Sequence, residues 1–298
     1  MPTAAVERGS VDVSGLPGGL DLQATLESGQ TYLWKREDGD TYDATGAHGG
    51  TGWYRTVVDG EAIRARQRDG ALEWEATTDA VPLLRRLLRL DDDLDAIISA
   101  TPEDPVIDEA YDRYRGMRIV RDPFVPCCVS FICSAQMRVS RIFGMQEALR
   151  EAYGEPVAFG DENLRSFPTA DRLAVATEAE LRDLGLGYRA PYVVETARAV
   201  ANGEFDPASL PREYEAAREA LTVLAGVGDK VADCILLFSL GYLEAVPLDT
   251  WIRTAVEEYY PECDRGTYAE TSRAIRERFG PYAGYAQTYV FHLLRHRG

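Results

Sequence analysis

Two glycines, Gly226 and Gly228, separate two stretches of helical periodicity, and this break constrains the fold more than any other feature of the chain. Residues 213–221 before it are rich in strong helix formers and carry an apolar stripe at helical spacing. After it, apolar residues return at the same spacing, at Val231, Ile235, Leu236 and Leu240. Glycine tolerates positive φ and lets the backbone approach a partner closely. The pattern therefore predicts a helix–hairpin–helix over residues 212–240.

A hairpin of this kind presents backbone N–H groups beside a helix N-terminus, a combination that binds phosphate. It can hold a DNA backbone without reading the base sequence. The alternative is an ordinary turn, in which glycine simply ends the first helix. The two glycines alone leave both interpretations open.

Lysine usage draws attention to the residue just after the hairpin. The chain has 32 Lys plus Arg, of which only Lys35 and Lys230 are lysine, so thirty (32 − 2) are arginine. Arginine stays protonated, whereas a lysine amine becomes a nucleophile when burial or neighbouring charge lowers its pKa. Lys230 is therefore a candidate nucleophile, with an accidental surface lysine as the alternative.

A carboxylate follows 19 positions later in the stretch Val246-Pro247-Leu248-Asp249. Proline stops the preceding helix, and Asp249 stands where an N-cap would precede a helix over 250–259. The role of helix cap would by itself explain an aspartate at position 249. Beside Lys230, the same carboxylate could instead stabilise a cationic sugar or assist the amine.

These residues belong to a larger set of motifs. The stretch L-x-G-V-G-x-K-V-A-D-C followed by A-V-P-L-D resembles the helix–hairpin–helix DNA glycosylase superfamily, and specifically the 8-oxoguanine DNA glycosylase family. Further matches occur in family order at residues 27–34, 129–134, 184–190 and 280–287. The resemblance extends over roughly residues 20 to 295.

The resemblance implies a bifunctional base-excision repair enzyme, a DNA N-glycosylase with DNA-(apurinic or apyrimidinic site) lyase activity. Its substrate would be double-stranded DNA containing 8-oxoguanine or another oxidised purine. Lys230 would attack C1′ and form a Schiff base, and Asp249 would stabilise the charge that develops on the sugar. The damaged base would be flipped into a pocket, as enzymes acting on a stacked base require. The substrate-binding residues carried over by the resemblance are Gly29, Cys234, Gln287 and Phe291.

The family also implies contacts to DNA outside the base pocket. Arg141 and Arg189 match positions that recognise the cytosine left behind by the flipped base. Relatives fill the gap in the duplex with an asparagine, where this chain has Gln136-Met137-Arg138. Two other departures are Ala225 in place of a hairpin proline and Trp251 in place of a phosphate-contacting histidine. The DNA-binding residues expected are Gln136, Arg138, Arg141, Tyr188, Arg189, Gly226 and Gly228.

The expected chemistry requires no cofactor. Some members of the superfamily hold an iron–sulfur cluster on four C-terminal cysteines, but of the five cysteines here only Cys263 lies in that region, so no cluster is expected. By resemblance, a structural cation would bind backbone carbonyls near Thr222, Leu224 and Val227.

Two rival functions remain open at this point. A monofunctional alkylated-base DNA glycosylase would use Asp249 with water and would not need Lys230. A noncatalytic helix–hairpin–helix DNA-binding module would need neither residue.

Composition suggests where such a protein works. The net charge of −17 and pI near 4.7 are unlike a generic nucleic-acid binder, which is usually basic. Abundant carboxylates with arginine favoured over lysine suit a cytoplasm rich in salt, where phosphate contacts weaken. We find no apolar run of membrane-spanning length and no signal-peptide core. We therefore expect a soluble, monomeric, cytoplasmic protein of prokaryotic type, with no membrane partner.

The chain as a whole predicts an α+β fold. Residues 1–18 are small and polar and predict a flexible tail. Residues 19–105 predict a mixed β/α domain with an antiparallel sheet, whose strands include 53–58, 62–67 and 72–76. Residues 106–298 predict a mainly helical glycosylase domain that contains the helix–hairpin–helix.

Overall fold

Two tight hairpins form the centre of the N-terminal sheet. The protein is described here by a computed structural model, which covers residues 5–39, 41–42 and 48–297. Strands β3 (Tyr54–Val58), β4 (Glu61–Arg68) and β5 (Ala71–Ala76) are joined by the pairs Asp59-Gly60 and Asp69-Gly70. All four of these residues have positive φ, the backbone that two-residue hairpin loops require. The predicted antiparallel sheet is confirmed.

The first strand corrects the expectation of a flexible tail over residues 1–18. Residues 1–4 lie outside the described part of the chain, but β1 (Glu7–Asp12) pairs antiparallel with β5. With β2 (Lys35–Arg36), the sheet has the order β1-β5-β4-β3-β2. Because β1 is an edge strand with mostly exposed side chains, its sequence carries little apolar alternation. Its place is fixed by backbone pairing and by close packing of Gly9 on the ring of Trp74.

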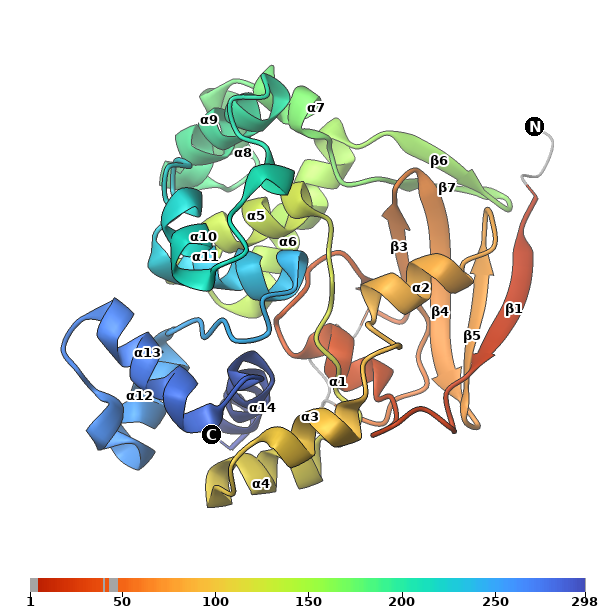
Figure 1. Ribbon diagram of the computed structural model, residues 1–298. Helices are drawn as coiled ribbons and strands as arrows, with labels where there is room; N and C mark the ends of the chain where they lie inside the picture. The colour runs from red at the N-terminus through yellow and green to blue at the C-terminus, as the bar shows by residue number, and fades with distance from the viewer. Residues whose placement is uncertain (1–4, 40, 43–47, 298) are drawn as a thin grey trace.

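Helices make up the rest of the chain (Figure 1). The helix α2 crosses one face of the sheet, and the remaining helices form two groups beside it (Figure 1). The fold is therefore an N-terminal antiparallel sheet domain followed by a mainly helical core, as predicted. None of the described helices is long and apolar enough to cross a membrane. The α-helices are α1 (Leu22–Glu27), α2 (Val81–Leu87), α3 (Leu94–Ala100), α4 (Pro105–Arg113), α5 (Phe124–Cys133), α6 (Val139–Tyr153), α7 (Ala170–Ala174), α8 (Glu178–Asp183), α9 (Ala190–Ala201), α10 (Tyr214–Leu221), α11 (Asp229–Ile235), α12 (Thr250–Tyr259), α13 (Tyr268–Phe279) and α14 (Ala283–Arg295).

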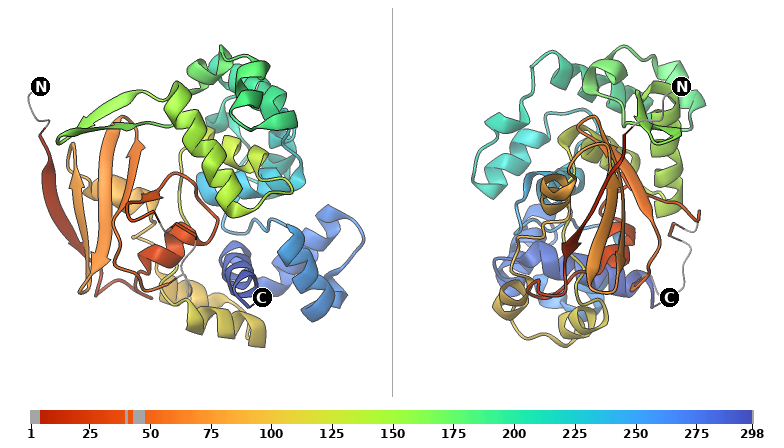
Figure 2. Two further views of the ribbon diagram at one scale, coloured as in Figure 1. Left: turned by 180° about the vertical axis from the view of Figure 1, so that it is seen from behind. Right: turned by 90° about the vertical axis from the view of Figure 1, so that its right-hand side faces the viewer.

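A β-hairpin from the helical part reaches back to the sheet. Strands β6 (Pro156–Phe159) and β7 (Glu162–Arg165) extend toward the sheet (Figure 2). Phe159 and Leu164 bury their side chains against Val57 and Ala62 of the sheet, in a small cluster apart from the main core. The sequence analysis did not anticipate this hairpin. It attaches the helical part to the sheet.

A buried arginine also ties segments of the two parts together. Arg118 is fully buried and donates hydrogen bonds to four backbone carbonyls, those of Pro17, Gly19, Arg89 and Asp92, at 2.8–3.0 Å. A guanidinium is rarely buried unless its donors are satisfied, and these four carbonyls satisfy them. The main hydrophobic core likewise runs without interruption from the sheet through α5 and α11 to α14. The helices that carry the site residues are therefore held in one packed body.

Candidate active site

The predicted hairpin lies between α10 and α11. Gly226 has a φ of +75°, and a Cβ atom at this position would lie only 2.7 Å from the Cβ of Tyr192. The close approach of the hairpin to α9 therefore requires glycine here. Gly228 is the N-cap of α11 and adds no side chain above the first turn. Both glycines are exposed, which leaves the hairpin backbone open to a partner.

A cavity of about 900 Å³ lies beside this hairpin, between α5, α11, α14 and the start of α12. Lys230 and Cys234 are four residues apart on α11, and Gln287 and Phe291 are four apart on α14, so each pair shares one helix face. The structure thus brings together every residue predicted for catalysis and base binding. The cavity is lined by Lys230, Asp249, Gly29, Cys234, Gln287 and Phe291, and also by Gln136 and Arg138.

The Lys230 side chain is half-buried in this cavity. Its Nζ donates a hydrogen bond of 2.9 Å to the Oγ of Ser134 and lies 5.3 Å from the centre of the Phe131 ring. Neither Ser134 nor Phe131 was among the predicted site residues. The amine is therefore held by a neutral hydroxyl and faces an aromatic ring.

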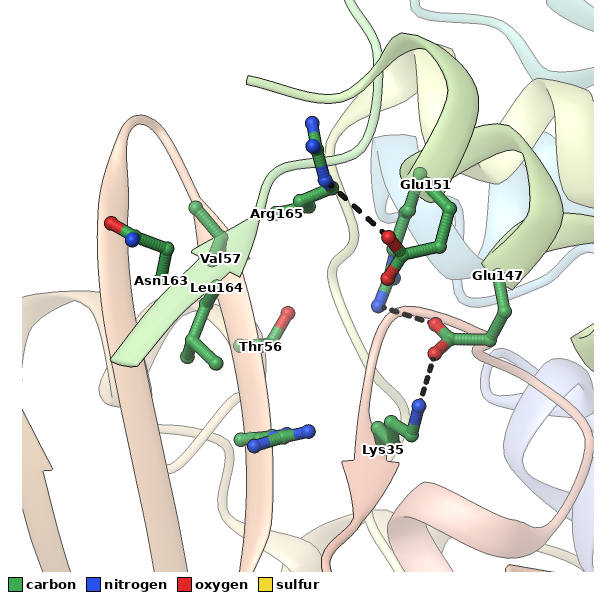
Figure 3. Close-up of a pocket in the computed structure, with 10 residues that line it drawn as sticks. Lys35, Thr56, Val57, Glu147, Glu151, Asn163, Leu164 and Arg165 are labelled. Atoms are coloured by element: carbon green, nitrogen blue, oxygen red, sulfur yellow. Dashed lines mark hydrogen bonds and ion pairs between the residues drawn. The ribbon is translucent and has the colours of Figure 1, made fainter. Parts of the chain in front are cut away.

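The second lysine has a different environment. Lys35 lies by a small cleft of about 70 Å³ between β3, β7 and α6 (Figure 3). Its Nζ forms an ion pair of 2.8 Å with Glu147, which also pairs with Arg150 at 3.1 Å. Figure 3 shows Lys35 and Glu147 pointing toward each other. Lys35 therefore donates to a carboxylate in an ion pair, whereas Lys230 donates to the hydroxyl of Ser134.

Asp249 is the N-cap of α12, as predicted. Its Oδ1 accepts a hydrogen bond of 2.9 Å from the backbone N–H of Ile252. Burial raises the pKa of the Asp249 carboxyl, while the Ile252 N–H and the charge of Lys230 act in the opposite direction. The cap fixes the carboxylate at the cavity, so the helix-cap and catalytic interpretations are compatible.

Gly29 occupies a position that favours glycine for two reasons. Its φ is +94°, and a Cβ atom would lie 3.5 Å from Phe291 and 3.1 Å from Nη1 of Arg295. Arg295 donates to the carbonyls of Glu27 and Ser28, at 2.7 and 3.0 Å, and so fastens this loop to α14. The Gly29 backbone is thereby held next to the Phe291 ring.

Cys234 and Gln287 complete the cavity with uncharged groups. Burial raises the pKa of the Cys234 thiol to about 12, so it remains protonated and presents a small, polarizable surface. Gln287 is buried, and its Oε1 lies 3.3 Å from the hydroxyl oxygen of Thr288, whose single proton is donated to the carbonyl of Gly284 at 2.7 Å. Within the described part of the chain the amide nitrogen of Gln287 donates no hydrogen bond, and the residue lines the cavity, where the amide can bind a ligand.

The predicted DNA-contact residues are divided between the cavity and its surroundings. Gln136 and Arg138 belong to the turn between α5 and α6, where Gln136 is exposed and has an unusual φ of +54°. Arg189 is only 3% exposed and donates to the carbonyl of Ala135 in this turn, while its guanidinium lies 4.3 Å from the ring of Tyr188. Tyr188 itself is 57% exposed. Arg141, on the first turn of α6, is exposed and does not line the cavity.

The carbonyls predicted to hold a cation lie in the hairpin turn. The Leu224 carbonyl accepts from the N–H of Val227 at 3.1 Å, which leaves one of its lone pairs for another partner. Backbone carbonyls are ligands that suit hard cations. All five cysteines are buried and unpaired, and the described residues contain no group of three or more His, Cys, Asp or Glu side chains placed to hold a metal.

The charge of the cavity is opposite to that of the whole protein. It is lined by four cationic side chains, those of Arg138, Lys230, Arg253 and Arg295, but by one carboxylate, that of Asp249. The chain as a whole has a net charge of −17. This local excess of positive charge favours an anionic ligand. The sequence analysis missed Arg253 and Arg295 because isolated arginines on helices have no distinguishing pattern.

Each half of the chain matches a known protein family. Residues 16–127 match the family described as 8-oxoguanine DNA glycosylase, N-terminal domain. Residues 129–281 match the HhH-GPD superfamily base excision DNA repair protein family. The first match covers the sheet domain from residue 16 onward and the second covers most of the helical core; they meet within α5, while β1 and α14 lie outside them.

Full-length relatives agree with these matches. A probable N-glycosylase/DNA lyase of Methanothermobacter thermautotrophicus is 32% identical over 94% of this chain and 95% of its own length. The N-glycosylase/DNA lyase of Arabidopsis thaliana is 32% identical over 91% of this chain and 76% of its own length. The chain is also similar to a solved structure of the Clostridium acetobutylicum 8-oxoguanine glycosylase/lyase, in complex with double-stranded DNA that contains cytosine opposite 8-oxoguanine. The two structures superpose with a TM-score of 0.83 at 25% sequence identity, and the match covers 100% of this chain and 99% of that one.

Proposed function

Because the chain belongs to the 8-oxoguanine DNA glycosylase family, within the HhH-GPD superfamily of base excision DNA repair proteins, we propose that the cavity described above is its active site. The protein is an N-glycosylase/DNA lyase that removes 8-oxoguanine. Its catalytic residues are Lys230 and Asp249. The observation that carries this assignment is the Lys230 amine, which lies in the one cavity that also contains Asp249 and the base-binding residues.

Lys230 acts as the nucleophile. The lone pair of its neutral amine forms a bond to C1′ as the bond from C1′ to the base breaks, and the base leaves with that electron pair. The base then takes up a proton, which balances the proton lost from the new ammonium. Transfer of a second proton from nitrogen to O4′ opens the sugar ring and leaves a Schiff base. Loss of a C2′ proton and departure of the 3′ phosphate complete the β-elimination that nicks the strand.

Asp249 supports the first of these steps electrostatically. Positive charge develops on the sugar as the base departs, and a fixed carboxylate nearby lowers the energy of that state. The N-cap hydrogen bond to Ile252 holds the carboxylate in place before the substrate arrives. Asp249 also relays protons between the amine and the leaving base.

The base pocket is formed by Gly29, Cys234, Gln287 and Phe291. Phe291 and Cys234 contact the two faces of the flipped base, and the amide of Gln287 binds its pairing edge. The carbonyl of Gly29 accepts the N7–H that oxidised guanine has and guanine lacks. A site built around such a hydrogen bond discriminates well against an analogue that cannot form it. The backbone of Gly29 is held near Phe291, which supports this role.

Double-stranded DNA binds across the face that carries the hairpin and the α5–α6 turn. The exposed hairpin glycines Gly226 and Gly228 bind phosphate, with a cation on the carbonyls of Thr222, Leu224 and Val227 as a structural support. Arg141, Tyr188 and Arg189 contact the strand opposite the lesion, and Gln136 or Arg138 fills the gap in the duplex. The local excess of cations at the cavity supports this binding mode.

The protein acts as a monomer in a cytoplasm rich in salt. The charge of −17 and the preference for arginine support the salt adaptation. In high salt, phosphate contacts weaken by counterion release, and binding then depends more on the base pocket and on backbone donors.

Borohydride trapping tests the assignment of Lys230. A duplex containing 8-oxoguanine opposite cytosine should form a covalent adduct with the unmodified chain, and Lys230→Gln should abolish that adduct. Lys35→Gln is the matched control, because it removes the only other lysine, whose side chain is 41% exposed. Loss of the adduct in both variants, or base release by Lys230→Gln at the rate of the unmodified chain, would contradict the proposal. The second outcome would instead indicate attack by water, as in an alkylated-base glycosylase.

A further inference from the structure

The hydroxyl of Ser134 has two hydrogen-bond partners, and together they determine what it can do for Lys230. Ser134 follows α5 as its C-cap, and its Oγ donates a hydrogen bond of 2.7 Å to the carbonyl of Phe131. The same Oγ accepts from the Nζ of Lys230 at 2.9 Å. A serine hydroxyl has one proton and two lone pairs. Because its proton is committed to Phe131, Ser134 can only accept from the lysine.

This one-way hydrogen bond suits a nucleophilic amine. A neutral amine has two N–H groups and one lone pair. Because this N–H is directed to Ser134, the serine hydroxyl does not occupy the lone pair that attacks C1′. A partner that donated its own proton to the amine would block that lone pair. The amine of Lys35, by contrast, donates to the carboxylate of Glu147.

The position of Ser134 is itself well fixed. Phe131 and Cys133 of α5 are buried, so the end of this helix is anchored in the core. The next residue, Ala135, receives a hydrogen bond from the buried Arg189 through its carbonyl. A rigid acceptor at this point restricts the rotation of the long lysine side chain and reduces the entropy lost on reaching the reactive geometry.

We propose that Ser134 is a positioning residue, which holds the Lys230 amine by accepting one of its N–H groups and leaves the lone pair free to attack C1′. The proposal rests on the assignment of Lys230 as the nucleophile. It predicts that Ser134 contributes to every step in which the amine attacks, including attack on an abasic site that no longer carries a base.

The variants Ser134→Ala and Ser134→Thr test this role. The measurement is the single-turnover rate of borohydride-trapped adduct on two duplexes, one with 8-oxoguanine and one with a preformed abasic site. For Ser134→Ala we expect a rate about tenfold lower on both duplexes, the effect of about 1.4 kcal/mol in the barrier. The enzyme concentration that gives half of the maximal rate should not change. Ser134→Thr keeps Oγ and should recover most of the rate.

Ser130→Ala is the matched control. Ser130 lies one turn earlier on α5, is buried and does not line the cavity. It should reproduce any loss of helix stability without the loss of rate. The proposal is overturned if Ser134→Ala forms adduct at the rate of the unmodified chain, or if Ser134→Thr is as slow as Ser134→Ala. If the unmodified chain itself forms no adduct, the proposed function fails, and the role of Ser134 fails with it.

Discussion

Replacing Gly29 with alanine separates the strain of the backbone from the recognition of the base. The φ of Gly29 is +94°, a conformation that costs a residue with a Cβ about 1–2 kcal/mol. The new Cβ would lie 3.5 Å from Phe291, an ordinary contact, and 3.1 Å from Nη1 of Arg295, which must shift by a few tenths of an ångström. Arg295 is held by two carbonyls but can absorb such a shift. We therefore expect the free energy of unfolding to fall by about 1–2 kcal/mol, mainly through backbone strain.

The effect on catalysis should depend on the substrate. The added methyl group points toward Phe291 and narrows the space assigned to the flipped base. One methyl group in a tight pocket changes discrimination by roughly 10- to 200-fold, and we expect excision of 8-oxoguanine to slow within that range. Cleavage at a preformed abasic site should keep its rate, because that substrate has no base. Single-turnover assays on two duplexes of one sequence make the comparison.

Gly60→Ala provides the matched control for this variant. Gly60 has a φ of +81° in the β3–β4 hairpin, and a Cβ there would meet no atom within 4 Å. It should lose a similar amount of stability and retain full excision. The reasoning is refuted if Gly29→Ala excises 8-oxoguanine as fast as the unmodified chain, or if its abasic-site cleavage falls by the same factor as its excision.

Two further predictions concern stability. Burial raises the pKa of Asp122 to about 7, well above its value in the unfolded chain, so its contribution to stability is complete at low pH and is lost as the pH rises toward neutrality. Between about pH 5 and pH 7, the free energy of unfolding of the unmodified chain should therefore fall by about 2–3 kcal/mol relative to that of Asp122→Asn, as measured by denaturant titration. Parallel pH profiles of the two proteins would contradict this. The net charge of −17 predicts that the unfolding midpoint rises as salt increases from about 0.1 M to about 1 M, where the screening length shortens to about 3 Å. A midpoint that is highest in dilute buffer would rule out salt adaptation.

Much of the site was determined by local sequence. The glycine hairpin, the shared helix face of Lys230 and Cys234, and the cap formed by Asp249 all depend on residues within a few positions of one another. Such features follow from helical periodicity, capping and the backbone freedom of glycine. For that reason they could be predicted before the structure was known. The wider motif set predicted the family and hence the base-binding residues, although their individual roles remain proposals.

Only the tertiary structure determined which groups meet in the cavity. Ser134 and Lys230 are 96 residues apart, and nothing in either local sequence indicates that their polar atoms lie 2.9 Å from each other. The edge strand β1 likewise has too little apolar alternation to be recognised from its sequence, because most of its side chains are exposed. Its strand conformation depends on backbone pairing with β5. The burial of Arg189 against Ala135 depends on the packing of two distant turns. Contacts of this kind arise from the assembly of the core, whereas a local pattern reports only the structure that neighbouring residues favour.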